Sequence, residues 1–187
     1  MPQQELVKKV VGVLNRLGIP YMMTGSMVSS LQGEPRSTHD ADIVIVLTAN
    51  KITQLIEAFP SPDYYLSADA VKDAIQRHSM FNLISSSDGF KVDFWLLTDE
   101  PFDQSRFNRR RPIKFDDLDV MASAPEDTIL IKLRWAKMLG GSEKQLLDAI
   151  RIYEVQVDQL DNTYLNEWAK RLDLMDDLEE LKKRAVR

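Results

Sequence analysis

Residues 36–47 read RSTHDADIVIVL, a polar run that leads into an apolar one. The part from Asp42 to Leu47 is rich in β-branched residues and almost continuously apolar, which predicts a central strand covered on both faces. Strand side chains repeat every two residues, so Asp40 and Asp42 are expected on one face. Two neighbouring carboxylates repel each other and need a counter-charge to stay ionised. A divalent cation such as Mg²⁺, which prefers oxygen ligands, would supply that charge.

A third carboxylate, Asp93, interrupts another apolar strand, Lys91–Leu97. An unpaired buried charge is costly, so this carboxylate either faces solvent or has a strong partner. If its strand lies beside the Asp42 strand, three carboxylates converge. That arrangement is typical of a two-metal phosphoryl-transfer site, in which one ion activates the attacking oxygen and the other neutralises the leaving phosphate. The alternative is an exposed position on an edge strand.

A phosphate-binding turn is predicted just upstream. Gly25 and Ser26 follow the short apolar strand Tyr21–Thr24 and begin a helix. Amide N–H groups and the helix dipole favour a phosphate there, and glycine permits a close approach of the backbone. Ser26 adds a hydroxyl donor, while Arg36 and Thr38 could contact the same polyphosphate, arginine by bidentate pairing. Together these residues predict a site for a nucleoside triphosphate and Mg²⁺. The alternative is an ordinary helix start capped by serine or threonine.

The composition excludes several other classes of site. The 187 residues include no cysteine and two histidines, which excludes a disulfide scaffold, a thiolate metal site and a cysteine nucleophile and disfavours a histidine-rich zinc site. The net charge of −5 means that the surface as a whole does not attract nucleic acid. No stretch approaches the roughly 20 apolar residues that span a bilayer, and no signal peptide is recognisable. We therefore expect a cytoplasmic protein without membrane contact.

The pattern along the chain predicts a mixed α/β unit over residues 1–122 and a helical unit over residues 123–187. A less regular region is expected between the last predicted strand and Pro125, and a frayed, charged end is expected after Met175. In the first unit, hydrophobic spacing predicts helices over 4–17, 27–32, 51–59 and 68–77, and strands over 21–24, 42–47, 80–84 and 90–97.

This combination of motifs resembles the nucleotidyltransferase superfamily, the DNA polymerase β-like fold in its minimal form. Residues Tyr21–Leu47 and Lys91–Leu97 carry the match. Residues 125–132, with Asp148 in the following helix, resemble small bacterial and archaeal members, including the abortive-infection toxin group. The resemblance implies an α/β (α+β) fold in which helices flank a mixed sheet and a helical subdomain follows.

The resemblance also implies roles for individual residues. The triphosphate would be held by Gly25 and Ser26, with Lys132 reaching the nucleotide from the helical unit. The metal would be bound by Asp40, Asp42 and Asp93, and Asp93 would also act as a base toward the acceptor hydroxyl. Toxin relatives often carry two aspartates three residues apart in the helix that holds Asp148, whereas this chain has Gln145 at the first of these positions.

Structural alternatives exist for the remaining charged residues. Lys132 lies beside an apolar stripe, where a lysine can bury its stem and expose its head. Asp148 stands four residues after Lys144, so a surface ion pair would explain it. The basic run Arg106–Lys114 is a candidate contact for RNA or phosphate, or else a solvated sheet edge that balances the acidic residues after it. His39 is expected to flank the site rather than to perform chemistry.

The function expected from these features is Mg²⁺-dependent, or Mn²⁺-dependent, transfer of a nucleoside monophosphate to an acceptor hydroxyl. The acceptor could be RNA such as a tRNA end, a protein, or a small molecule such as an aminoglycoside. One alternative is a non-catalytic nucleotide-binding module on the same fold, for example a partner in a toxin–antitoxin pair. Another is a two-metal hydrolase on a different scaffold.

Overall fold

The computed structural model describes residues 3–38 and 40–185, so His39 lies outside the described residues. By its internal contacts the chain forms two compact units. Unit 1 comprises Met1–Gly25 and Thr38–Ala122, and unit 2 comprises Ser26–Ser37 and Ser123–Arg187. The sequence predicts units over residues 1–122 and 123–187, whereas the contacts group residues 26–37 with residues 123–187.

Hydrogen bonds inside unit 2 explain why residues 26–37 group with the C-terminal helices. Gln32 donates from Nε2 to the carbonyl oxygen of Ser123 at 2.7 Å, and Gln156 Nε2 donates to the carbonyl oxygen of Gln32 at 2.9 Å. Gln32 is itself buried. These side-chain to backbone bonds link segments that are distant in the sequence, and no local pattern could have predicted them.

Unit 1 is built on a mixed sheet. Within the described residues it has seven strands in the order β3-β4-β5-β2-β1-β7-β6. The central strand β2 pairs with β1 in the antiparallel direction and with β5 in the parallel direction. The strands are β1 Tyr21–Thr24, β2 Asp40–Ile45, β3 Tyr64–Tyr65, β4 Met80–Ser85, β5 Lys91–Leu96, β6 Arg111–Phe115 and β7 Leu118–Ala122.

The central strands have one apolar, buried face and one face that carries polar groups. Ile43 in β2, Phe94 in β5 and Phe81 in β4 are register partners and are almost completely buried. Val44, on the opposite face of β2, is buried as well. The strand predicted from DIVIVL is therefore confirmed as central and covered on both faces near its C-terminal end. The mixed α/β class is confirmed with it.

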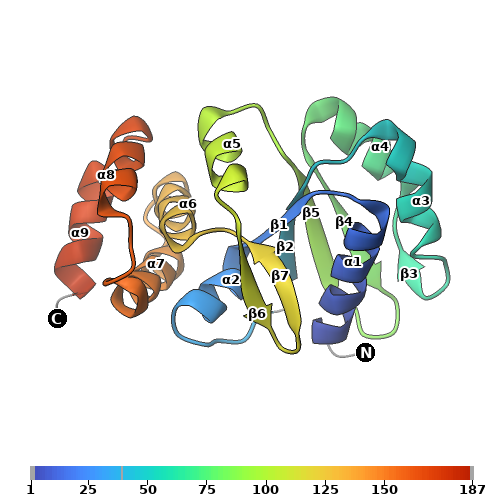
Figure 1. Cartoon of the computed structure of the whole chain (residues 1–187), viewed down its shortest axis with the longest axis horizontal. Coiled ribbons are helices and arrows are strands. Elements are labelled where there is room, and N and C mark those ends of the chain that lie inside the picture. Colours follow the sequence, from blue (N-terminus) through green and yellow to red (C-terminus); the bar gives the residue numbers. More distant parts are fainter. Residues whose placement is uncertain (1–2, 39, 186–187) are drawn as a thin grey trace. The chain divides into compact units, whose positions relative to one another are not determined.

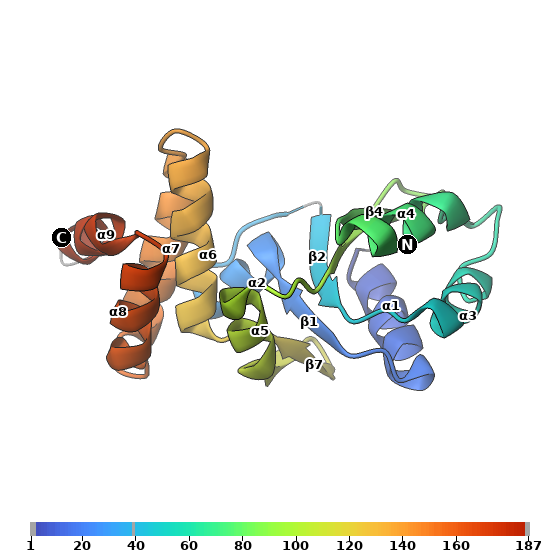
Figure 2. The same cartoon turned by 90° about the horizontal axis from the view of Figure 1, so that it is seen from above.

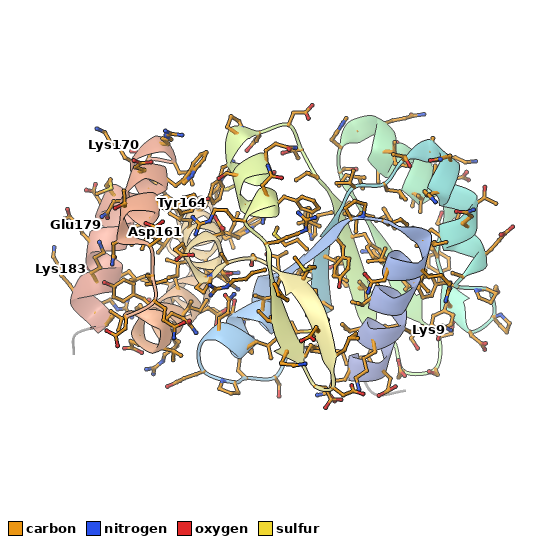
Figure 3. The ribbon with its side chains drawn as sticks, in the orientation of Figure 1. Lys9, Asp161, Tyr164, Lys170, Glu179 and Lys183 are labelled. Carbon is orange, nitrogen blue, oxygen red and sulfur yellow. The ribbon has the colours of Figure 1, made fainter. Side chains whose placement is uncertain are left out.

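Three helices of unit 1 lie together beside β3 and β4 (Figures 1 and 2). Buried valines and leucines fill one side of the first helix, and its Lys9 donates to the hydroxyl of Tyr64 in β3 at 3.0 Å. Lys9 is labelled in Figure 3. These helices are α1 Gln3–Leu17, α3 Ile52–Glu57, which is preceded by a 3₁₀ turn over Ala49–Lys51, and α4 Ala68–Arg77.

The region expected to be less regular is in fact ordered, and that prediction is wrong. Helix α5, Pro101–Asn108, buries Phe102 and Phe107, and the hairpin β6–β7 follows it. The two phenylalanines are five residues apart and give little helical periodicity, which hid the helix. Phe107 packs with Met22 and Val44, so α5 covers part of the polar-bearing face of the sheet.

Unit 2 is helical. Helix α6 packs on α7, and α7 packs on α9. Asp161 accepts a bond from the backbone N–H of Tyr164 at 2.9 Å and so caps α8; both residues are labelled in Figure 3. None of the described helices is long and apolar enough to cross a membrane. The helices are α2 Gly25–Gln32, whose first residue belongs to unit 1, α6 Pro125–Met138, α7 Glu143–Gln156, α8 Asn162–Arg171 and α9 Met175–Ala185.

The expected frayed end is also wrong, because α9 is packed. Leu178 and Leu181 are fully buried, whereas Lys183 and Glu179 point away from the helices (Figure 3). The charged residues occupy one side of the helix and the leucines occupy the other. Two leucines three residues apart are too short a pattern to predict a helix from the sequence alone.

Truncating the buried side of α9 should destabilise the protein. We expect Leu181→Ala to lower the free energy of unfolding by about 2–5 kcal/mol, because it leaves a cavity in a fully buried position. The matched control Lys183→Ala, on the exposed side, should change it by less than about 0.5 kcal/mol. Urea denaturation followed by circular dichroism measures both, and equal effects would contradict the packing of α9.

Candidate functional site

A row of polar side chains crosses four neighbouring strands of unit 1. Asp42 in β2 is the register partner of Asp93 in β5, and the row extends to Thr24 in β1 and Asn82 in β4. Register partners in a sheet share a face, so all four side chains emerge on the same side. Asp40, two residues before Asp42, shares that face, with a side chain that is 54% exposed.

The carboxylate of Asp93 is buried and fully compensated. The residue is only 8% exposed, and β5 lies between β4 and β2, so the alternative of an exposed edge position is wrong. Asn82 donates from Nδ2 to Asp93 Oδ1 at 2.7 Å, and the ammonium of Lys91 lies 2.9 Å from Oδ2. The same ammonium is 3.8 Å from Asp40 Oδ1. Its hydrogen bond to Asp93 raises the pKa of Lys91, although burial acts in the opposite direction.

Asp42 is held between a glycine and a tryptophan. Trp95 donates from its indole nitrogen to Asp42 Oδ1 at 3.2 Å. Gly25 has a φ of +70°, and a Cβ at this position would lie 2.0 Å from Asp42 Oδ2. The sequence predicts that Gly25 contacts a phosphate. The structure adds a second reason for glycine, because the Asp42 carboxylate occupies the space that any side chain would need.

The donors on this face suit Mg²⁺, which commonly takes one or two carboxylates and completes its shell with substrate phosphates and water. Asp42 and Asp93 provide two carboxylates in register. Next to Asp42, the buried hydroxyl of Thr24 finds no hydrogen-bond partner within the described residues. However, in that same part of the chain no three or more acidic or histidine side chains lie close enough together to hold one ion. These residues therefore fit an ion held by two carboxylates, Asp42 and Asp93. Asp40 lies on the same face, two residues earlier in β2.

A second charged cluster lies inside unit 2. Arg36 binds Asp148 with two hydrogen bonds, from Nε to Oδ1 at 2.8 Å and from Nη2 to Oδ2 at 2.7 Å. Lys132 donates to the same Oδ2 at 2.8 Å. Arg36 Nη2 also donates to the hydroxyl of Ser26 at 2.9 Å. The cluster thus joins α2, the connector after it, α6 and α7 through one carboxylate.

This cluster corrects two of the structural alternatives. The side chains of Lys132 and Asp148 are only 4% and 9% exposed, so Lys132 does not extend its head into solvent. Asp148 pairs with Arg36 and Lys132 and not with the exposed Lys144. Burial raises the pKa of Asp148, but the hydrogen bonds from Arg36 and Lys132 outweigh it and hold this pKa below its usual value.

Solved structures share this arrangement of strands and helices. An antigenic nucleotidyltransferase-like protein from Paracoccidioides brasiliensis aligns over 97% of this chain and 92% of its own, with a TM-score of 0.58 and 20% identity. The antibiotic-resistance factor ANT(2'')-Ia, crystallised with adenylyl-2''-tobramycin, aligns over 98% of this chain and 99% of its own, with a TM-score of 0.58 and 10% identity. The chain has the nucleotidyltransferase fold.

The resemblance inferred from the motifs is thereby confirmed at the level of the fold. At these identities the likeness concerns the nucleotidyltransferase fold alone. The sequence matches no protein-family model and no curated protein.

Within the nucleotidyltransferase fold, the predicted site residues fall in both units. Unit 1 contains Gly25, Thr38 and the three aspartates, and it brings Asp42, Asp93 and Gly25 together. Unit 2 contains Ser26, Arg36 and Lys132 and brings these three together around Asp148. Thr38 donates to the carbonyl oxygen of Asp40 at 3.3 Å.

Sequence reasoning missed three residues of the polar face: Lys91, Trp95 and Asn82. A signal existed for two of them, because Lys91 and Trp95 stand two positions either side of Asp93 and must share its face. Asn82 could be found only from the register between β4 and β5.

Two of the five basic residues in the run Arg106–Lys114 form ion pairs with acidic neighbours. Arg106 is buried and pairs with Asp103 at 2.8 Å, and Lys114 pairs with Asp119 at 2.9 Å. The guanidinium of Arg110 lies 4.1 Å from the centre of the Phe107 ring. Strand β6 is at one edge of the sheet, where a proline and charged side chains discourage further strand pairing. This geometry favours the solvated-edge interpretation.

Replacing Gly25 should disturb Asp42 specifically. Gly89 is a matched control, since it has the same φ of +70° but nothing within 4 Å of its Cβ position. We expect Gly89→Ala to cost about 1 kcal/mol of backbone strain. Gly25→Ala should cost at least about 1–3 kcal/mol more, because it also forces the carboxylate to move. Urea denaturation of both variants measures the difference, and equal costs would contradict the close contact with Asp42.

Removing the charge of Asp148 should be costly because Arg36 and the buried ammonium of Lys132 both lose the carboxylate that they bind. We expect Asp148→Asn to lower the free energy of unfolding by about 3 kcal/mol or more at pH 7, and Lys144→Ala to leave it nearly unchanged. Since the folded pKa of Asp148 is lowered, its stabilisation is present above the unfolded pKa of about 3.9 and is lost as the pH falls further. The difference between wild type and variant should therefore begin to shrink near pH 4 and continue to shrink as the pH falls further, as denaturation at several pH values would show.

Proposed function

We propose that this protein is a nucleotidyltransferase that transfers a nucleoside monophosphate from a nucleoside triphosphate to an acceptor hydroxyl and releases pyrophosphate. The observation that carries the proposal is the register of Asp42 with Asp93, beside Gly25, in a chain with the nucleotidyltransferase fold. No other pair of carboxylates on this sheet face stands directly opposite each other in the described strands.

In this proposal Asp42 and Asp93 hold Mg²⁺ or Mn²⁺, and Asp40, which is half exposed, adds negative charge at the rim. When bound, the ion would neutralise charge on the phosphates and lower the pKa of an attacking hydroxyl. The hydroxyl oxygen forms a bond to the α-phosphorus while the bond to the pyrophosphate oxygen breaks. Asp93 is assigned the hydroxyl proton, because each of its oxygens retains a lone pair beyond the bond it accepts.

The triphosphate is assigned to Gly25, Ser26 and the N-terminus of α2. Helix N-termini present amide N–H groups and a positive dipole end to phosphates. Thr38, in the connector that leads into β2, can add a hydroxyl donor.

Arg36 and Lys132 form the charged part of the proposed phosphate site. Arg36 and Lys132 each bring a positive charge to the Asp148 cluster, and positive charge attracts a polyphosphate. Because Asp148 engages both Nε and Nη2 of Arg36, we assign Arg36 to positioning Lys132 and Ser26 rather than to bidentate phosphate binding.

The acceptor is proposed to be a hydroxyl of a small molecule. ANT(2'')-Ia, which shares the fold, was crystallised with an adenylylated antibiotic. In the basic run, which was the candidate contact for RNA, Arg106 and Lys114 are already paired with acidic neighbours. RNA and protein acceptors are outcomes that the experiment below distinguishes.

A second candidate function is nucleotide binding without catalysis. It is favoured by one observation, that an ammonium and not a third carboxylate lies next to Asp93 Oδ2. The presence or absence of turnover separates the two functions.

One experiment distinguishes nucleotidyl transfer from nucleotide binding without catalysis. The protein is incubated with cell extract, Mg²⁺ or Mn²⁺ and one labelled nucleoside triphosphate at a time. We expect label to move to a small molecule and pyrophosphate to appear, and both to fall by at least about a hundredfold in Asp42→Asn and in Asp93→Asn. The control Asp69→Asn changes a side chain that is 98% exposed and should retain full turnover. Turnover that survives both site substitutions would refute the proposal, whereas metal-dependent nucleotide binding without any turnover would favour the binding module.

A further inference from the structure

The ammonium of Lys91 occupies one oxygen of Asp93, a proposed metal ligand. It lies 2.9 Å from Asp93 Oδ2 and 3.8 Å from Asp40 Oδ1. It reaches this position because Lys91 precedes Asp93 by two residues in β5 and is the register partner of Asp40. The chain itself therefore supplies a cation to Asp93, one of the two proposed metal ligands.

Compensation of Asp93 is needed on energetic grounds. Its carboxylate is nine-tenths buried and faces Asp42 across the strand pair, so it is strongly disfavoured without opposite charge or donors. Asn82 satisfies Oδ1, and Lys91 satisfies Oδ2 and supplies the charge. A divalent ion at Asp93 would meet this ammonium at close range, and like charges at such a distance repel strongly.

Lys91 is able to move. Its side chain is 33% exposed, and the adjacent Asp40 is 54% exposed. A lysine ammonium is a compact charge on a flexible stem of four carbons, so it can leave Asp93 for solvent or for Asp40 without a change of backbone. Asn82, by contrast, is held in the sheet and can stay on Oδ1.

We propose that Lys91 is the exchangeable counter-ion of the cation site: its ammonium neutralises Asp93 until a divalent ion displaces it from Oδ2. The proposal rests on the assignment of Asp42 and Asp93 as cation ligands under the proposed function. It implies weak binding of the ion alone, because the ion must displace an ammonium. Nucleotide phosphates then favour ion entry by adding negative charge. Lys91 thus couples ion binding to nucleotide binding and disfavours occupancy by free metal.

Titration of the full chain with Mn²⁺ alone, without nucleotide, tests this. Electron paramagnetic resonance measures free Mn²⁺, and tryptophan fluorescence, to which Trp95 beside Asp42 contributes, is a second readout. We expect Lys91→Met to bind Mn²⁺ at least about tenfold more tightly than wild type. Lys91→Arg, which keeps the charge, should stay near wild type. The control Lys72→Met removes an equal charge at an exposed position on α4 and should also stay near wild type.

Lys91→Gln is a second neutral variant, to be used if Lys91→Met does not fold. The glutamine amide can still donate a hydrogen bond to Asp93. This variant too should bind Mn²⁺ more tightly than wild type. If wild type binds Mn²⁺ and both neutral variants that fold bind it equally or more weakly, Lys91 is not a competitor and the inference is overturned while the metal site stands. If neither wild type nor any folded variant binds Mn²⁺, the cation site itself fails, and the inference fails with it.

Discussion

The parallel pairing of β2 with β5 places Asp42 directly opposite Asp93, and the rest of the site is organised by how this like-charged pair is compensated. Gly25 leaves room for one carboxylate, and Asn82 and Lys91 bind the other. Each compensating group comes from a strand, or from the residue directly after one, so the sheet itself aligns the groups. A shift of one residue in the register would move one aspartate into the apolar face, at a prohibitive cost.

Unit 2 shows the same principle with the charges reversed. There one buried carboxylate, Asp148, is shared by two cations, and the pairing with Arg36 links residues 112 positions apart. Breaking such a cluster exposes the remaining charges to an apolar environment, so it specifies how the helices and the connector before β2 fit together. Each unit therefore contains one cluster around a buried carboxylate: acidic side chains lie near Asp93 in unit 1, and basic side chains bind Asp148 in unit 2.

The sequence predicts the local parts of this structure well, because strand alternation and apolar runs are local. The central strand, the Gly25 turn and the shared face of Asp40 and Asp42 all follow from spacing. Helix α5 was not predictable in this way, since its buried phenylalanines lack helical spacing. The partners of Asp148 were not predictable either, because Lys144 was nearer in sequence than Arg36. The two-residue alternation that places Asp40 and Asp42 on one face also places Lys91 on the face of Asp93. A lysine at the start of a strand is usually exposed to solvent, however, so this pairing was not predicted.

The balance of charge on the site face constrains how many ions it can hold. Asp40, Asp42 and Asp93 contribute three negative charges to this face, and the ammonium of Lys91 contributes one positive charge. One divalent ion would bring the sum of these charges to zero. A second ion would make the face positive unless the phosphates of a nucleotide entered with it, as is usual where Mg²⁺ is bound by few carboxylates. On the proposed function, a two-metal arrangement would need the nucleotide phosphates as ligands, so charge would determine the order in which ions and nucleotide bind.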